Sequence, residues 1–441
     1  MTKPAPELTV VVILLATALL LLPPGRTETG RDRMSIDRIM DKVVIEGKEL
    51  PELTGRPIRG LRLMAIENGR PKAVPFQVDE RTPEGDYVMK RPDGTEDRDA
   101  DQGRLDQNDE LVFMAMDAGD HGSADDFPER CSFHEIKLID PQSGAAGWVY
   151  LVYFPESPSP LSTKRYMKYM EHEDSDEVVS PYYTLHFPKK NVFISGFMVH
   201  RAAGGNDTDI MDRIKMRSGV EVLAGSVKLL RTEEDFSTEV LGVIKGPVRV
   251  IRQTSTRLNL LLSLKSPSVV VDGSFYPCSF EFPSLLSIPF RMDMVASDAY
   301  IRQGWDLNRN ALGMKFYSNI EPQGVTLDGS MSKREKKLAS SRKTLQWALA
   351  TGEQGTFMFR GVWDRKAPFR ALLYYEDNLS RKEPPEEDPG VMGFAYKLVD
   401  LLKMGSEKYS FNIENYVVPG FEGDRKRALR VFYHPLEVEI N

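Results

Sequence analysis

The sequence predicts an all-β protein in which two antiparallel β-sandwich-like domains follow an N-terminal hydrophobic segment. Three observations lead to this prediction. Many short segments alternate apolar and polar residues, turn signals such as Asn-Gly and Asp-Gly separate them, and long amphipathic helices are scarce. Short strands divided by turns are typical of antiparallel sandwiches, whereas a βαβ fold needs helical segments between its strands.

The chain begins with an apolar run, Leu8–Leu22, that ends at Pro23. This run suits the hydrophobic region of a signal peptide and is shorter than the roughly 20 residues that span a bilayer comfortably. Ala16–Ala18 has the small-x-small pattern of a signal-peptidase site but lies inside the run, so a removed signal peptide and an uncleaved anchor both stay open. We therefore expect residues 1–34 to be a signal peptide or a single membrane anchor. Either one makes the protein periplasmic or extracellular, and the anchor would tether it to the inner membrane.

Composition agrees with an exported protein that has sizeable cores. Hydrophobic residues make up 41% and charged residues 28% of the chain, and the formal net charge is −7. An acidic balance spread along the chain offers no footprint for nucleic acid. The two cysteines, Cys131 and Cys278, could form one disulfide or stay free.

The first predicted domain covers residues 35–154. Alternating segments at Ile58–Ile66 and Ala73–Val78 flank Asn68-Gly69, which predicts a hairpin because a type I′ turn needs positive φ at both central residues. Asp109–Met116 reads as a buried strand. A second hairpin is expected between residues 136–139 and 148–154, and the Pro/Ser-rich stretch 155–164 is the predicted linker.

The second predicted domain covers residues 165–441 and is also rich in strands. A hairpin is expected over Thr344–Trp363, around Gly352–Gly355, and further strands are expected through Ala428–Ile440. The charged stretch Ser332–Lys343 fits a short exposed helix and a loop equally well. The acidic, proline-rich insert 380–390 is expected to be a disordered surface loop.

The densest polar cluster of the sequence lies in the loop before the strand at Asp109–Met116. Calcium takes six to eight hard oxygen ligands, and a short loop with alternating carboxylates supplies several of them. The spacing differs from an EF-hand loop, and an acidic solvated loop is the alternative. Calcium is thus the candidate cofactor, with these metal-ligand candidates: Asp97, Asp99, Asp101, Asp106, Asp109 and Glu110.

Two segments of this first domain carry a family resemblance. AVPFQVDER (Ala73–Arg81), followed by LDQNDELVFMAMDAG (Leu105–Gly119), resembles an N-terminal module of exported bacterial β-sandwich proteins of unknown function, with the pattern P-x-Q-V-D-E and then D-x-x-D-E-L-V-F. Some of those proteins are associated with polysaccharide metabolism. GVIKGPVRVIRQT (Gly242–Thr254) is similar to the strand that begins supersandwich domains in carbohydrate-active proteins. The resemblance implies a β-sandwich and a loose association with glycans, and it transfers no catalytic residue.

Signatures of common enzymes are missing from the sequence, which has no GxSxG elbow, P-loop, dinucleotide fingerprint or HExxH pair. The segment His200–Arg217 contains the basic and acidic groups that a uronate lyase would need, although a charged turn and strand edge is the simpler interpretation. Trp305 lies in the polar context QGWDLNRN and is the candidate for stacking on a sugar ring.

These observations favour an exported cell-envelope protein with a non-catalytic role in binding or scaffolding, and a polysaccharide or an envelope protein as partner. Two alternatives stay open: a polysaccharide-active lyase or hydrolase, and a membrane-anchored accessory subunit of an envelope complex.

Overall fold

The computed structural model describes residues 32–441 apart from positions 129, 157, 223–226, 260–264, 288–290, 295, 385 and 387–388. Within these residues the protein is mainly β, as predicted, and its strands form several antiparallel sheets. The same residues contain two α-helices, α2 (Lys333–Ala339) and α3 (Arg425–Tyr433). The predicted signal or anchor segment, Leu8–Leu22, lies outside the described residues. No helix in the described part of the chain is both long and apolar enough to cross a membrane.

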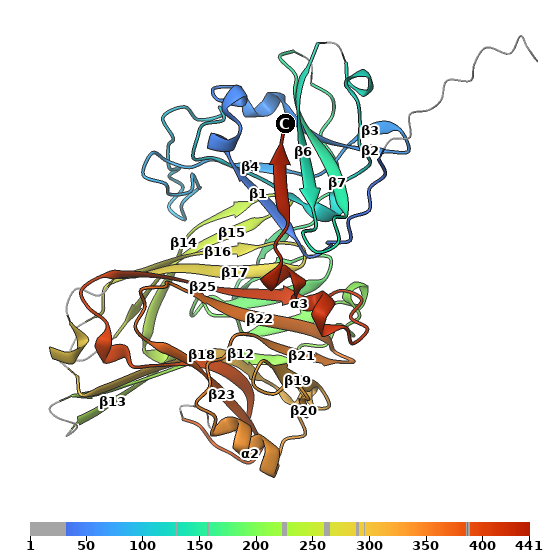
Figure 1. Cartoon of the computed structure of the whole chain (residues 1–441). Helices are drawn as coiled ribbons and strands as arrows, with labels where there is room; N and C mark the ends of the chain where they lie inside the picture. Colours follow the sequence, from blue (N-terminus) through green and yellow to red (C-terminus); the bar gives the residue numbers. More distant parts are fainter. Residues whose placement is uncertain are drawn as a thin grey trace, which may run out of the picture.

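The first block of the chain forms two sheets around one apolar core (Figure 1). The core includes Ile45 and Phe113 from the smaller sheet and Leu63 and Leu151 from the larger one. The smaller sheet has the order β1 (Lys42–Glu46), β5 (Glu110–Met114), β4 (Gln77–Asp79). The larger sheet, called the β7 sheet below, has the order β26 (Glu437–Ile440), β6 (Ser132–Ile139), β7 (Ala146–Tyr153), β2 (Leu61–Glu67), β3 (Arg70–Ala73).

The hairpin expected around Asn68-Gly69 is confirmed. Strands β2 and β3 pair antiparallel up to Glu67 and Arg70, and the two residues between them have φ values of 53° and 73°. These positive values are the backbone conformation that Asn and Gly tolerate and that other residues avoid.

The second block forms three sheets that share the largest core of the protein. The nine-stranded sheet has the order β14 (Phe236–Lys245), β15 (Val250–Leu258), β16 (Val269–Phe275), β17 (Ser279–Ser287), β25 (Lys408–Val417), β22 (Gly355–Trp363), β21 (Ala348–Gly352), β19 (Lys315–Ser318), β20 (Val325–Thr326). A five-stranded sheet, called the β12 sheet below, has the order β13 (Val227–Thr232), β12 (Met211–Val222), β18 (Asp298–Leu307), β24 (Val391–Val399), β23 (Arg370–Asn378). The four-stranded sheet has the order β11 (Gly196–Val199), β10 (Tyr183–Pro188), β9 (Ser175–Val179), β8 (Lys168–Glu171).

Aromatic side chains from all three sheets meet in this core. The ring of Phe197 in β11 lies 5.1 Å from that of Trp305 in β18 and 5.3 Å from that of Phe357 in β22, measured between centroids. Such tilted and edge-on pairs add to the burial of apolar area. The hairpin predicted over Thr344–Trp363 is confirmed by the antiparallel pairing of β21 with β22.

The strands predicted over Ala428–Ile440 are only partly correct, because helix α3 occupies the beginning of this segment. Asp424 caps the helix by accepting the backbone N–H of Arg427, and Ala428, Val431 and Phe432 are buried. Their spacing of three and four residues matches one face of a helix. Because the run of apolar residues is short, its helical period was not recognisable in the sequence, and a strand was predicted instead.

The C-terminus returns to the first block, so the last strand does not lie in the domain that the sequence suggested. Strand β26 pairs with β6 from Glu437 opposite Ile139 to Ile440 opposite Ile136. Figure 1 shows this strand rising from α3 into the upper part of the molecule. Both cysteines are free, with Cys278 buried and Cys131 half-buried.

A buried guanidinium joins the two blocks. Arg249, just before β15, is 2% exposed, and its Nε donates to Asp79 Oδ2 of β4 at 2.9 Å. Its Nη2 donates to Glu110 Oε2 of β5 at 2.6 Å, and its Nη1 donates to the hydroxyl of Tyr276. Burial alone would raise the pKa of Glu110, but the guanidinium groups of Arg249 and Arg81 hold it below its usual value.

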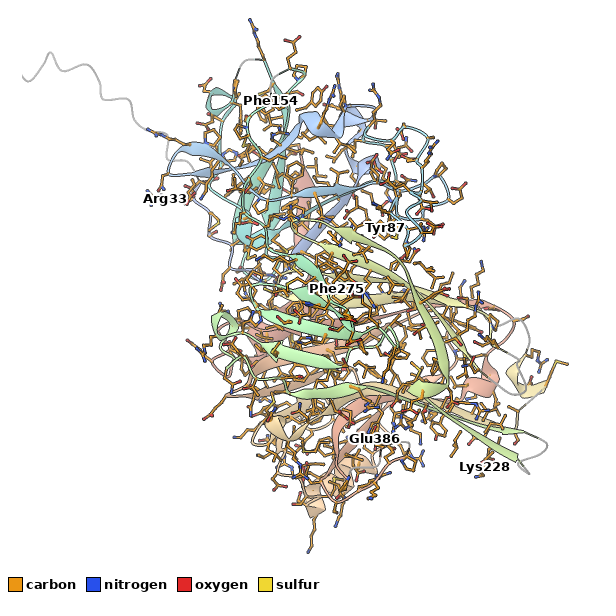
Figure 2. The ribbon with its side chains drawn as sticks, turned by 180° about the vertical axis from the view of Figure 1, so that it is seen from behind. Arg33, Tyr87, Phe154, Lys228, Phe275 and Glu386 are labelled. Atoms are coloured by element: carbon orange, nitrogen blue, oxygen red, sulfur yellow. The ribbon has the colours of Figure 1, made fainter. Side chains whose placement is uncertain are left out.

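A buried amide completes this Arg249 network. Gln77 Oε1 accepts the backbone N–H groups of Val248 and Arg249 at 3.0 and 2.7 Å, and its Nε2 donates to Asp79. A Cβ atom at Gly246 would overlap the Gln77 amide, so this approach of the two chains needs glycine. Tyr87 stacks on Arg81 in the same region and marks the junction of the blocks in Figure 2.

We expect Arg249→Met to lower the free energy of unfolding by about 3–5 kcal/mol, because it leaves the buried carboxylate of Asp79 without its cation and leaves Glu110 with Arg81 alone. Arg257→Met is the matched control, since Arg257 lies on β15 and is exposed. It should change the free energy of unfolding by less than about 0.5 kcal/mol. Denaturant unfolding measures both, and equal effects of the two substitutions would contradict a central role for Arg249.

Candidate functional site

Charged side chains gather on the face of the β12 sheet that is opposite the aromatic core. Because side chains alternate along a strand, Arg213, Lys215 and Arg217 of β12 share this face. Asp306 of the paired strand β18 lies beside them, with a carboxylate oxygen 2.6 Å from Lys215 Nζ. We call this group, with Arg302, the sheet-face cluster.

Two glutamates of the segment 380–390, Glu383 and Glu386, contact the sheet-face cluster. Glu386 Oε2 lies 2.8 Å from Lys215 Nζ, and Glu383 Oε1 lies 2.7 Å from Arg302 Nη2. The expectation of a disordered surface loop is therefore wrong for these two residues, because each finds a cation on the sheet. Figure 2 shows Glu386 over the lower sheets of the molecule.

The sheet-face cluster contains only part of the segment His200–Arg217, whose charged groups the sequence suggested for a uronate lyase. His200 instead contacts Thr184 Oγ1 and the carbonyl of Pro181, and the side chain of Arg201 is 81% exposed. The space among Lys215, Asp306 and their neighbours measures about 10 Å³. This is about the volume that one water molecule needs, so no sugar ring fits while the two glutamates are in place.

Burial changes the pKa of one carboxyl group of the sheet-face cluster, that of Asp306. It raises the pKa of Asp306 to about 7, against the opposing effect of Lys215. A carboxyl with a folded-state pKa above its unfolded value of about 3.9 binds more protons in the folded protein, so its contribution to stability falls as the pH rises between those two values.

We expect wild type to lose about 1–2 kcal/mol of unfolding free energy between pH 5.5 and pH 8 through this group. Asp306→Asn should abolish that part of the loss, whereas Asp298→Asn, at the exposed start of the same strand, should keep it. Urea unfolding at the two pH values measures the difference. Parallel pH profiles for wild type and Asp306→Asn would contradict the assignment.

The six candidate metal ligands divide into two groups. Asp99, Asp101 and Asp106 each bring one carboxylate oxygen to within 4.8 Å of the others. The remaining three have other partners. Asp97 pairs with Arg91, Asp109 accepts backbone N–H groups, and Glu110 belongs to the Arg249 network.

Trp305 is not a surface platform for sugars. It lies in β18 and not in a loop, its exposed fraction is 4%, and its ring packs between Phe197 and Phe357. Among the polar residues around it, Asp306 alternates to the other face of the sheet, and Asn308, Arg309 and Asn310 follow the end of β18, which gave Trp305 the appearance of a loop residue.

A pocket of about 160 Å³ lies where the N-terminal segment meets α3, and no pattern in the sequence indicated it. It is lined by two remote parts of the chain: residues 37–41, and residues 418–422 together with the adjoining α3 and its cap. We call it the α3 pocket. Its walls combine apolar groups, including Phe421 and Val431, with charged groups, including Glu422 and Arg427. The side chain of Arg427 is 52% exposed and lies 2.8 Å from Asp37.

Comparison with models of protein families finds no match for this chain, and comparison with curated proteins finds none either. Among solved structures, an alpha-mannosidase from Enterococcus faecalis V583 is similar over 93% of this chain and 45% of its own, at 7% identity and a TM-score of 0.47. A protein in the glycosyl hydrolase family 38 from Enterococcus faecalis is similar over 93% of this chain and 46% of its own, at 8% identity and a TM-score of 0.45. This chain spans less than half the length of either structure. At these scores the similarity is distant and supports no conclusion about chemistry.

Proposed function

We propose that this protein is an exported cell-envelope protein that binds a saccharide, without catalysis, in the α3 pocket. The observation that carries the proposal is the pocket itself, because its size and its mixture of aromatic, apolar and charged walls suit a sugar. The ligand is then a terminal sugar of a polysaccharide, and the first 34 residues provide the export signal or the anchor.

The volume favours a single ring. Cavities of about 150 Å³ hold one six-membered ring such as benzene, and the α3 pocket has about 160 Å³. It is smaller than the pockets of roughly 300–1,000 Å³ that hold drug-sized ligands. One sugar of a longer chain would enter, and the rest of the polysaccharide would lie outside.

The wall chemistry favours a polar ring with hydroxyl groups. Arg427 offers donors in a planar fork, and the carboxylate of Glu422 accepts hydrogen bonds. Phe421 supplies an apolar ring against which the C–H face of a sugar packs. The lining segment 37–41 also contains the buried ion pair of Arg38 and Asp41.

We expect the full-length protein to bind a subset of glycans on a broad array, and Arg427→Ala to weaken that binding about tenfold, or about 1.4 kcal/mol. Arg425→Ala is the matched control. Arg425 lies on the same helix but lines no part of the pocket, and it contacts the Pro322 carbonyl and the Tyr317 ring.

The control should bind within about twofold of wild type, with both affinities measured by calorimetry. A blank array, or an equal affinity of wild type and Arg427→Ala for the selected glycan, would overturn the proposal. Amino-terminal sequencing of the native protein separates the export alternatives, since an intact Met1 indicates an anchor and a start after Ala18 indicates a removed signal.

A second candidate function, a lyase or hydrolase for acidic polysaccharides, is favoured by one observation. The sheet-face cluster brings Lys215, Asp306 and Glu386 together, and proton transfer needs such convergent groups with a pKa near neutral. Because Glu383 and Glu386 form ion pairs with Arg302 and Lys215, a substrate would first have to displace them from these cations. If wild type cleaves uronate polysaccharides and Asp306→Asn does not, this function is established. If wild type shows no turnover, this function is excluded.

A further inference from the structure

We propose that Asp99, Asp101 and Asp106 form a calcium site in the loop that precedes β5. This site is separate from the α3 pocket, and the proposal of calcium binding does not depend on saccharide binding. It also differs from the set of six ligands that the sequence suggested, because only three of those carboxylates converge.

The first observation is the convergence itself. One carboxylate oxygen of each residue lies within 4.8 Å of the other two, which is the separation of ligands that share one calcium ion at 2.3–2.6 Å. The three residues come from both sides of Gly103, whose φ of 83° allows the chain to turn back on itself. The turn therefore places Asp106 next to Asp99 and Asp101.

The second observation is a buried carboxylate oxygen without a donor. Asp99 is 8% exposed, and its Oδ1 accepts the backbone N–H of Ala100 at 2.7 Å. Its Oδ2 is buried and has no hydrogen-bond partner. A buried anionic oxygen is costly unless a hydrogen bond or a cation satisfies it, so a ligand belongs at this position.

Lysine and arginine side chains of the described residues do not neutralise these three aspartates. Within the described residues, no lysine or arginine forms an ion pair with any of the three aspartates. Arg91 is engaged by Asp97 and Gln253, and Arg104 donates to the carbonyl of Gly55.

A second acidic triad provides an internal comparison. Asp212, Asp306 and Glu386 also converge, but there Lys215 Nζ lies within 2.8 Å of two of them and takes the place of an ion. The triad at Asp99 lacks such an ammonium group. This difference indicates that the Asp99 triad, and not the Asp306 triad, needs a cation from solution.

The ligand type selects calcium over other common ions. The triad contains carboxylates only, without the His or Cys ligands that zinc prefers. Calcium accepts irregular sets of carboxylate, carbonyl and water oxygens, whereas magnesium requires near-ideal octahedral geometry. A single short loop that supplies three carboxylates leaves the remaining positions to water and backbone carbonyls.

The ion would also brace the junction of the two blocks. Asp106 Oδ1 accepts the N–H groups of Asn108 and Asp109, and the carboxylate of Asp109 accepts the N–H of Asp106. The next residue, Glu110, holds Arg249. A calcium ion on Asp106 therefore stabilises the turn that leads directly into the Arg249 network.

The experiment compares full-length wild type with Asp99→Asn, Asp101→Asn and Asp97→Asn, after chelation and with about 2 mM calcium. We expect calcium to raise the Tm of wild type by about 3 °C, since an ion that binds only the folded state stabilises it by mass action. Asp99→Asn and Asp101→Asn should lose this shift. Asp97→Asn carries the same charge change in the same loop but removes a partner of Arg91, so it should keep the shift.

Calorimetry with calcium alone provides the direct readout and should give one ion per chain for wild type and Asp97→Asn. Asp101 is only half-buried, so its Asn variant should keep the wild-type circular dichroism and test the site even where Asp99→Asn does not fold. Equal calcium shifts in all four proteins, or no binding to wild type at millimolar calcium, would overturn the proposal. A larger effect of magnesium than of calcium would also overturn it.

Discussion

The structure depends most on how one buried guanidinium is neutralised. Arg249 is removed from water at the junction of the two blocks, and a charge in that position is tolerated only with complete pairing. Asp79 and Glu110 provide the charge, and Gln77 holds the backbone beside the arginine. Because these groups come from β4, β5 and the start of β15, the network forms only when both blocks are folded and correctly oriented. It therefore helps to specify the relative orientation of the blocks, together with apolar contacts such as those of Val112 and Met114 of β5, which belong to the largest core.

The family resemblance noted in the sequence acquires a physical meaning through this network. The P-x-Q-V-D-E segment contributes Gln77 and Asp79, the D-x-x-D-E-L-V-F segment contributes Glu110, and the distant segment Gly242–Thr254 contributes Arg249. These three segments thus meet in one interface.

The two ends of the described chain are also joined by an arginine. Arg38 pairs with Asp41 and Asp140 and donates to the carbonyl of His434 at the end of α3. This contact holds the N-terminal segment against the C-terminal helix, and the α3 pocket is the space left between them. The return of β26 to the β7 sheet has the same consequence, because it keeps α3 at the boundary of the blocks. The candidate binding site therefore exists only because remote parts of the chain meet.

The sequence by itself determined the mainly β class, the hairpins at Asn68-Gly69 and Gly352–Gly355, and the acidic loop that contains Asp99, Asp101 and Asp106. These features depend on local alternation, on the φ preferences of Asn and Gly, and on residues close together in the chain. Only the tertiary structure decided that Trp305 is buried, that α3 replaces a strand, and that Glu383 and Glu386 cover Lys215 and Arg302. It also decided which three of six acidic residues converge. Burial and long-range pairing depend on which strands become neighbours, and that choice reflects the summed packing of the whole chain, which no local pattern contains.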